Sequence, residues 1–102
     1  MDDEGVVRSR YEHGGDTIAD VTVAGKVYQV GPNKGLRRPL PARYATLMNV
    51  GPGNLLFGRN HALGNYPLPP GLGYTFDYVD VSGIVLQDNG TACSWTIDYT
   101  GP

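Results

Sequence analysis

Glycine and proline interrupt this sequence so often that a long helix has no room to form. Fifteen glycines and eight prolines are spread over 102 residues, between short runs rich in Val, Ile, Thr and Tyr. Proline breaks helix interiors, and the β-branched and aromatic residues between the breaks favour strands. A hydrophobic fraction of 40% with a charged fraction of 18% is not the composition of a disordered chain. The sequence therefore predicts many short strands joined by turns.

The apolar runs place these strands along the chain. We expect strands over residues 18–23, 26–30, 43–50, 55–58, 74–79, 84–87 and 91–100. Turn signals at Ala24-Gly25, at residues 51–54 and at Asp88-Asn89-Gly90 predict that the strands on either side pair as hairpins. Residues 31–41 and 59–73, dense in Gly and Pro, are expected to be surface loops.

Alternation within the strands predicts which side chains face the core. Alternation places Arg43 on the same face as Ala45 and Leu47, and gives residues 74–79 an aromatic face. The last strand alternates most regularly, and its core face consists of Cys93, Trp95, Ile97 and Tyr99.

These patterns predict an all-β fold, a small antiparallel β-sandwich or barrel of about seven or eight short strands. We expect a single domain over residues 18–102. Residues 1–17 are polar with mixed charge and are expected to form an extended N-terminal arm.

Charge and composition exclude several classes of protein. The formal charge of −2 and a pI near 5.5 argue against nucleic-acid binding, which usually requires a basic excess on one face. A single cysteine forms no internal disulfide. The acidic N-terminus is unlike a signal peptide, and no apolar run has the length of a membrane span. We expect a soluble protein that is made in a cytoplasm and does not bind membranes.

The residue types that carry catalysis do not form a recognisable constellation. His13 and His61 have no metal-ligand spacing, and Cys93 is expected to be a buried, inert thiol. Asp77 and Asp80 are three positions apart and are expected to point to opposite faces of a strand. We therefore predict no catalytic residues, no metal site and no cofactor, and a protein that is not an enzyme.

Two segments are candidate partner-binding surfaces. The first is the loop of Leu36, Arg37, Arg38 and Leu40, because a proline-stiffened loop loses little entropy on docking and arginine is favoured at interfaces. The second is in the arm, at residues 6–11, with Val6, Val7, Arg8, Arg10 and Tyr11 as its contacts. Tyrosines can also bind sugars or proteins when they are not used by the core, and the candidates are Tyr66, Tyr74, Tyr78 and Tyr99.

Four short segments carry a resemblance to a known family: residues 47–51 (LMNVG), 66–71 (YPLPPG), 75–77 (TFD) and 92–96 (ACSWT). With these segments, the size of the chain and its polar leading arm, residues 43–100 resemble the small β-sandwich virion proteins of tailed bacteriophages. It implies a capsid decoration, or cement, protein on the outer capsid surface of the virion. Such proteins bind the major capsid protein, commonly as trimers, and often place an N-terminal arm on a neighbouring capsomer.

Two other functions remain open from the sequence. The same small sandwich could be a neck, tail-tip or fibre component, which copy number per particle would distinguish from decoration. It could also be a carbohydrate-binding module that uses its tyrosines.

Overall fold

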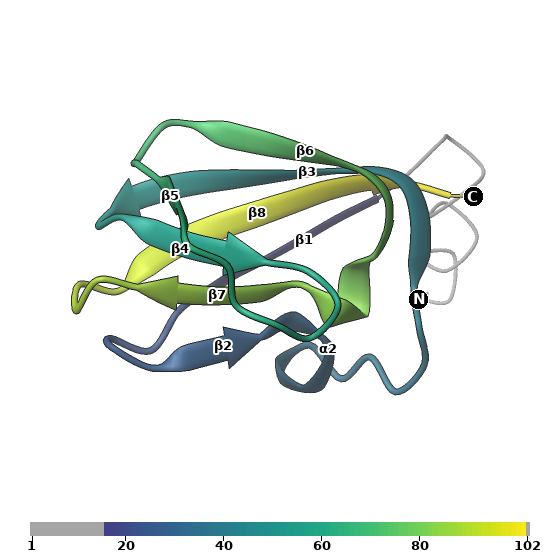
Figure 1. Cartoon of the computed structure of the whole chain (residues 1–102), viewed down its shortest axis with the longest axis horizontal. Coiled ribbons are helices and arrows are strands. Elements are labelled where there is room, and N and C mark those ends of the chain that lie inside the picture. The colour runs from purple at the N-terminus through teal and green to yellow at the C-terminus, as the bar shows by residue number, and fades with distance from the viewer. Residues whose placement is uncertain (1–15, 102) are drawn as a thin grey trace, which may run out of the picture.

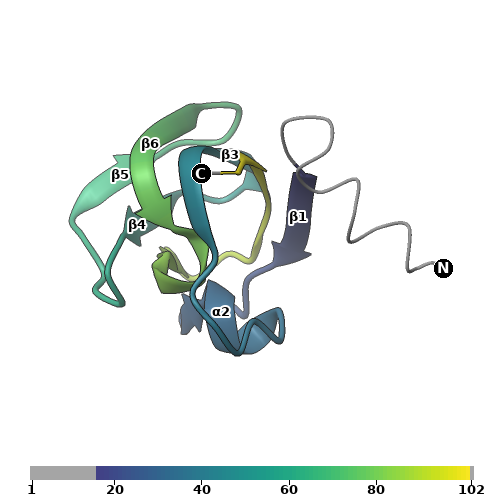
Figure 2. The ribbon, with the colours of Figure 1, turned by 90° about the vertical axis from the view of Figure 1, so that its right-hand side faces the viewer.

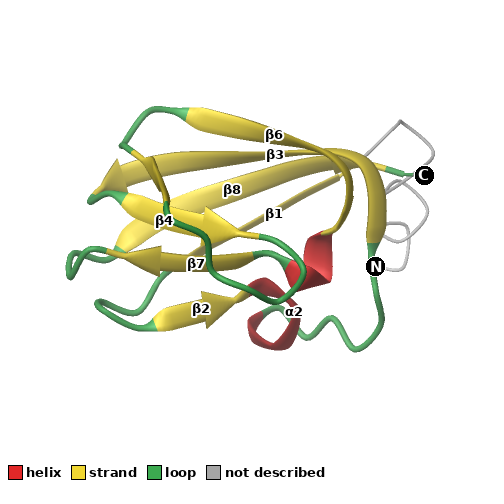
Figure 3. Cartoon of the chain, in the orientation of Figure 1, coloured by secondary structure: helices red, strands yellow, loops and turns green. Residues whose placement is uncertain are grey.

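The computed structural model describes residues 16–101, which form a sandwich of two four-stranded sheets. Figures 1 and 3 show the two layers of strands, with short helical segments between some of the strands. The strands are β1 (Asp16–Val21), β2 (Val27–Gln29), β3 (Pro41–Pro52), β4 (Leu55–Gly58), β5 (Tyr66–Leu68), β6 (Gly73–Asp80), β7 (Val85–Asp88) and β8 (Cys93–Thr100). The helical segments are α2 (Val30–Asn33) and the 3₁₀ turn η1 (Val81–Gly83). The predicted all-β, antiparallel class is confirmed.

The strands pair in a nested order. β1 pairs with β8, β2 with β7, β3 with β6 and β4 with β5, all antiparallel. Two further pairings, β3 with β8 and β4 with β7, complete the sheets β1-β8-β3-β6 and β2-β7-β4-β5. This is jelly-roll topology, in which a long antiparallel ribbon is folded over on itself.

The three predicted hairpins are wrong. β1 and β2, β3 and β4, and β7 and β8 lie in different sheets, so each turn carries the chain from one layer to the other. Only β4 and β5 are consecutive strands that pair with each other. The turn residues were recognised correctly, but a tight turn alone does not determine whether the strands stay in one sheet.

Several element boundaries also differ from the prediction. Asp16 and Thr17, assigned to the arm, begin β1 and pair with Tyr99 and Asp98. The expected loop over residues 31–41 contains most of α2 and ends at Pro41, where β3 begins. The expected loop over residues 59–73 contains β5. This strand is not predicted from the sequence because Pro67 lies in it and proline is disfavoured inside sheets. β5 is an edge strand, where proline is tolerated.

The core lies between the two sheets and is filled by side chains. Cys93, Trp95, Ile97 and Tyr99 are all buried, which confirms the alternation expected for β8. Leu47 of β3, in the same sheet as β8, and Leu55 of β4, in the other sheet, are also fully buried. The Trp95 ring packs edge-on against Tyr28 of β2, with 5.4 Å between ring centroids, and so joins the two layers.

The alternation fails where β3 and β6 cross the end of the sandwich. Ala42 and Ala45 are both buried, three positions apart, and Arg43 between them is exposed rather than in the core. On β6, Phe76 and Val79 are buried in the same spacing, and Tyr78 points outward with φ of 51°. This left-handed backbone conformation is uncommon for tyrosine. It changes which face of the sheet the following residues occupy.

No helix among residues 16–101 is long and apolar enough to cross a membrane.

Candidate binding surfaces

The basic loop, residues 36–40, is attached to the core at both ends. Leu36 and Leu40 are half-buried and pack against the hydrophobic core. The Leu36 amide donates to the Gly31 carbonyl at 2.8 Å, and the Leu40 amide donates to the Asp80 carboxylate at 2.8 Å. Arg37 and Arg38, between these anchors, are exposed. The structure thus places all four predicted loop residues together, two as anchors and two at the surface.

A polar hollow of about 420 Å³ lies beside the basic loop. Its polar lining includes Gln29, His61, Asp80 and Ser82, together with Arg37 and Arg38. Asp80 accepts hydrogen bonds from the Ser82 amide at 3.0 Å and the Ser82 hydroxyl at 2.7 Å. Burial opposes ionisation of Asp80, but the bonds from Ser82 and Leu40 and the nearby His61 outweigh it and lower its pKa. Asp80 therefore holds the loop and the η1 turn together as a carboxylate.

The arm contacts lie outside the described residues. Val6, Val7, Arg8, Arg10 and Tyr11 precede Asp16, where the described chain begins. His13 also lies outside the described range. Figure 2 shows β1 at one side of the molecule and β5 and β6 at the other.

An aromatic groove occurs on that second side, between the edge strands β5 and β6. It has a volume of about 430 Å³ and is lined by Phe57, Tyr66, Pro67, Leu68 and Tyr74. Phe57 forms the buried floor, with ring centroids 4.8 Å from Tyr74 and 6.3 Å from Tyr66. Tyr66 is 74% exposed and Tyr74 is 47% exposed. Two large rings thus remain accessible to solvent around an apolar groove.

The ring series continues along β6 to a guanidinium. Phe76 lies 4.9 Å from Tyr74, edge-on, and the Arg59 guanidinium carbon lies 5.9 Å from the centre of the Phe76 ring. Arg59 Nη2 also donates to the Tyr78 carbonyl at 2.7 Å and makes a longer contact of 3.4 Å with the Asp77 carbonyl. Arg59 therefore covers part of the free edge of β6.

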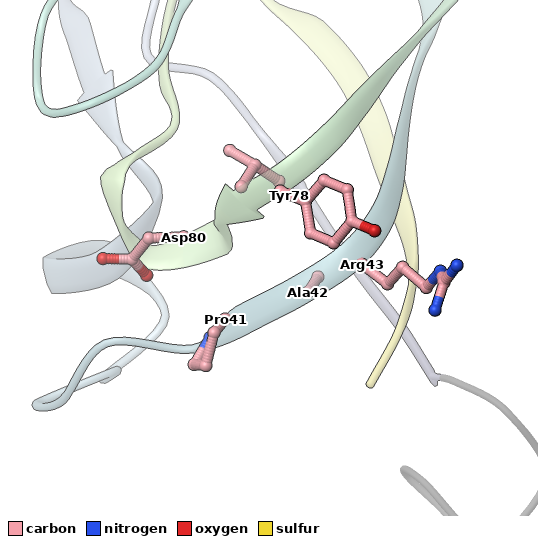
Figure 4. A pocket seen from close by; sticks show the side chains of 6 residues that line it. Pro41, Ala42, Arg43, Tyr78 and Asp80 are labelled. Atoms are coloured by element: carbon pink, nitrogen blue, oxygen red, sulfur yellow. The ribbon is translucent and has the colours of Figure 1, made fainter. Parts of the chain in front are cut away.

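A second, smaller hollow of about 260 Å³ lies where the alternation of inward and outward side chains is interrupted on β3 and β6. Figure 4 shows Tyr78 and Arg43 reaching the same surface, while Asp80 points away. The Arg43 guanidinium lies 5.7 Å from the Tyr44 ring centre and 5.9 Å from that of Tyr78. Tyr78 is 70% exposed, so this aromatic side chain is at the surface rather than in the core.

Cys93 is separate from the other groups that could support catalysis, which are His61, Asp80 and Ser82 at the polar hollow, where the Ser82 hydroxyl donates to Asp80 rather than to His61. Cys93 is fully buried, and burial is the main cause that raises the pKa of its thiol, which makes it a poor nucleophile. His61 is exposed at the polar hollow. Within residues 16–101 no three His, Cys, Asp or Glu side chains are grouped so that they could hold a metal ion.

Sequence reasoning identified the tyrosines of the groove but not their partners. Tyr66 and Tyr74 were candidates, whereas Tyr99 lies in the core. Phe57 and Arg59 were missed because they lie near the end of β4, and β5 had not been recognised as its partner strand. The sequence signal that could have found them is Phe57 in an expected strand, followed two positions later by the basic Arg59.

Comparison with known proteins gives the fold only. One similar solved structure is a de novo designed double-stranded β-helix determined by solution NMR, with a TM-score of 0.54 and 14% identity over 82% of this chain and 97% of that chain. Another is a crystal structure of a cupin domain from Bordetella pertussis, with a TM-score of 0.51 and 11% identity over 84% of this chain and 80% of that chain. No family model and no curated protein matches the chain.

Proposed function

We propose that this protein is a non-enzymatic structural protein of a bacteriophage virion, a decoration protein that binds the outer surface of the head and stabilises the shell. The observation that carries the proposal is the basic loop. Leu36 and Leu40 fix its ends in the core, so Arg37 and Arg38 are presented on a rigid support. A preformed loop loses little conformational entropy when it docks, and arginine pairs well with carboxylates on a partner surface.

A binding role also agrees with the filled interior. The space between the sheets is occupied by side chains such as Trp95 and Leu47. The hollows described above are at the surface, and in the one lined by Ser82, His61 and Asp80 the Ser82 hydroxyl donates to Asp80 rather than to His61. Recognition of another molecule requires only the exposed surface of such a domain.

The partner would be the major capsid protein, and the chain would act as a homo-oligomer, with a trimer as the favoured state. Several weak contacts made at once by an oligomer increase the effective concentration of each contact. Binding to the assembled shell alone stabilises it by mass action. The arm residues around 6–11 would supply a second contact in this arrangement.

The first test is the copy number of this protein per purified particle, measured by quantitative mass spectrometry against the major capsid protein. We expect a number comparable to that of the capsid protein. A much smaller number would assign the protein to the neck, tail tip or a fibre. Absence from the particle would overturn the virion proposal.

The second test addresses the basic loop. Arg37→Ala and Arg38→Ala are expected to weaken binding to undecorated particles, measured by co-sedimentation at moderate salt. Lys26→Ala is the matched control, because Lys26 is an exposed cation in the turn between β1 and β2. Equal binding by all three variants and the parent chain would exclude the loop as a contact.

A further inference from the structure

We infer that the aromatic groove between β5 and β6 is a binding site for an acidic oligosaccharide, with sugar rings against Tyr66 and Tyr74 and a carboxylate at Arg59. This inference does not depend on the proposed virion role. It rests on three observations: the exposed rings, the covered strand edges beside them, and a guanidinium without an acidic partner.

The exposed rings provide the stacking surface. Tyr66 and Tyr74 stand at two sides of the Phe57 floor, and their planes are tilted by 37° and 42° relative to it. The apolar face of a pyranose packs on an aromatic ring, and a tyrosine hydroxyl can bond the sugar at the rim. A groove of about 430 Å³ is large enough for a sugar unit.

The strand edges beside the groove are poorly suited to bind an extended peptide. β5 and β6 are both edge strands, and strand addition would require their free backbone groups. Pro67 removes one donor from β5, and Arg59 already bonds the Tyr78 carbonyl of β6 at 2.7 Å. Recognition by side-chain stacking, as sugars require, remains available.

The Arg59 guanidinium determines the expected charge of the ligand. Within residues 16–101 no carboxylate lies within ion-pair distance of it, although the protein is acidic overall. The neighbouring Asp77 is exposed and pairs across the sheet with Tyr44, on the outer face of that sheet. A carboxylate on a bound sugar would give Arg59 the bidentate partner that its geometry favours.

The experiment titrates the full chain with a hexamer of galacturonic acid and with a neutral glucose hexamer, by isothermal calorimetry. We expect binding of the acidic hexamer that is about fivefold tighter than binding of the neutral one. Tyr66→Ala should weaken both by about fivefold to tenfold. Arg59→Gln should remove the preference for the acidic hexamer.

The control is Tyr44→Ala, which removes a tyrosine that is 45% exposed on another surface and should leave the affinities unchanged. Circular dichroism of each variant checks the fold. The inference is overturned if neither hexamer binds, if Tyr66→Ala binds as the parent chain does, or if Tyr44→Ala causes the same loss. Binding of a proline-rich peptide at this groove, with no binding of either hexamer, would replace the sugar by a protein partner. Particle copy number tests the virion role separately and would be unaffected by any of these results.

Discussion

The two lateral sides of the sandwich use tyrosine in opposite ways. On the β1–β2 side, Tyr28 is 4% exposed, packs on Trp95 and donates from its hydroxyl to Asp20 at 2.5 Å. Lys34 then reaches Asp20 at 3.9 Å and the Ala19 carbonyl at 3.1 Å. On the β5–β6 side, Tyr66 and Tyr74 are left partly or mostly exposed around a groove.

This difference shows that one side is closed by the chain itself and the other is available to a ligand. The hydroxyl of Tyr28 has a carboxylate partner. The pKa of Tyr28 is raised, mainly by burial. The hydrogen bond from Tyr28 is the largest cause that lowers the pKa of Asp20. Both shifts favour a neutral tyrosine bonded to an ionised aspartate, which clasps the edge strands of the two sheets together.

The largest expected effect comes from removing the ring on the closed side. Tyr28→Ala should lower the free energy of unfolding by about 3–5 kcal/mol, because it leaves a cavity beside Trp95. Urea unfolding followed by tryptophan fluorescence measures the change. A loss below about 1 kcal/mol would show that the closed side does not depend on this ring.

A smaller effect on stability is expected from replacing Asp88. Its buried hydrogen bonds join the turn between β1 and β2 to the turn between β7 and β8. Asp88 accepts from the Thr22 hydroxyl at 2.5 Å, the Gly25 amide at 2.6 Å and the Gly90 amide at 2.9 Å. Burial raises the pKa of Asp88, but these three bonds outweigh burial and lower it overall. Asp88→Asn should cost about 1–2 kcal/mol at neutral pH, since the Thr22 hydroxyl loses a charged acceptor.

The pH dependence of this effect follows from the lowered pKa. The stabilising contribution of Asp88 is complete above the ordinary aspartate pKa and is lost as the pH falls through the lower value of the folded state. The difference in free energy of unfolding between the parent chain and Asp88→Asn should therefore decrease at acid pH. Urea unfolding at several pH values below about 5 measures this, with exposed Asp77→Asn as the control. A gap that stays constant with pH would contradict an ionised Asp88.

The Tyr28 hydroxyl is expected to contribute less than the ring. Tyr28→Phe keeps the contact with Trp95 and removes the bond to Asp20, so it should cost about 1 kcal/mol. Because Asp20 is exposed, water can replace part of the lost bond. The comparison of Tyr28→Phe with Tyr28→Ala in the same urea assay separates the clasp from the packing.

The smallest effect is expected on the open side. Tyr66→Ala should change the free energy of unfolding by less than about 0.5 kcal/mol, because the ring is 74% exposed. The same urea assay checks this. A loss as large as that of Tyr28→Ala would mean that Tyr66 supports the fold, and the contrast between the two sides would disappear.

Local pattern was sufficient for every strand except β5 and for much of the core. The breaks at Gly and Pro and the β-branched runs predicted an all-β domain, and the alternation of β8 predicted the burial of Cys93, Trp95, Ile97 and Tyr99. These features depend on neighbouring residues alone, because side chains alternate across any strand. The basic loop was also found this way, since its proline and arginines are adjacent in the chain.

Tertiary structure decided everything that depends on pairing between distant strands. Asp88-Asn89-Gly90 indicates a turn, but whether β8 stays beside β7 or enters the other sheet depends on β1 and β3, which lie many residues earlier. The groove has the same origin, because Phe57, Tyr66 and Tyr74 meet only when β4, β5 and the edge of β6 are folded together. The sequence by itself determined most of the strands, the turns and the buried face of β8, whereas the jelly-roll order and the open aromatic side arise from long-range packing that no local pattern contains.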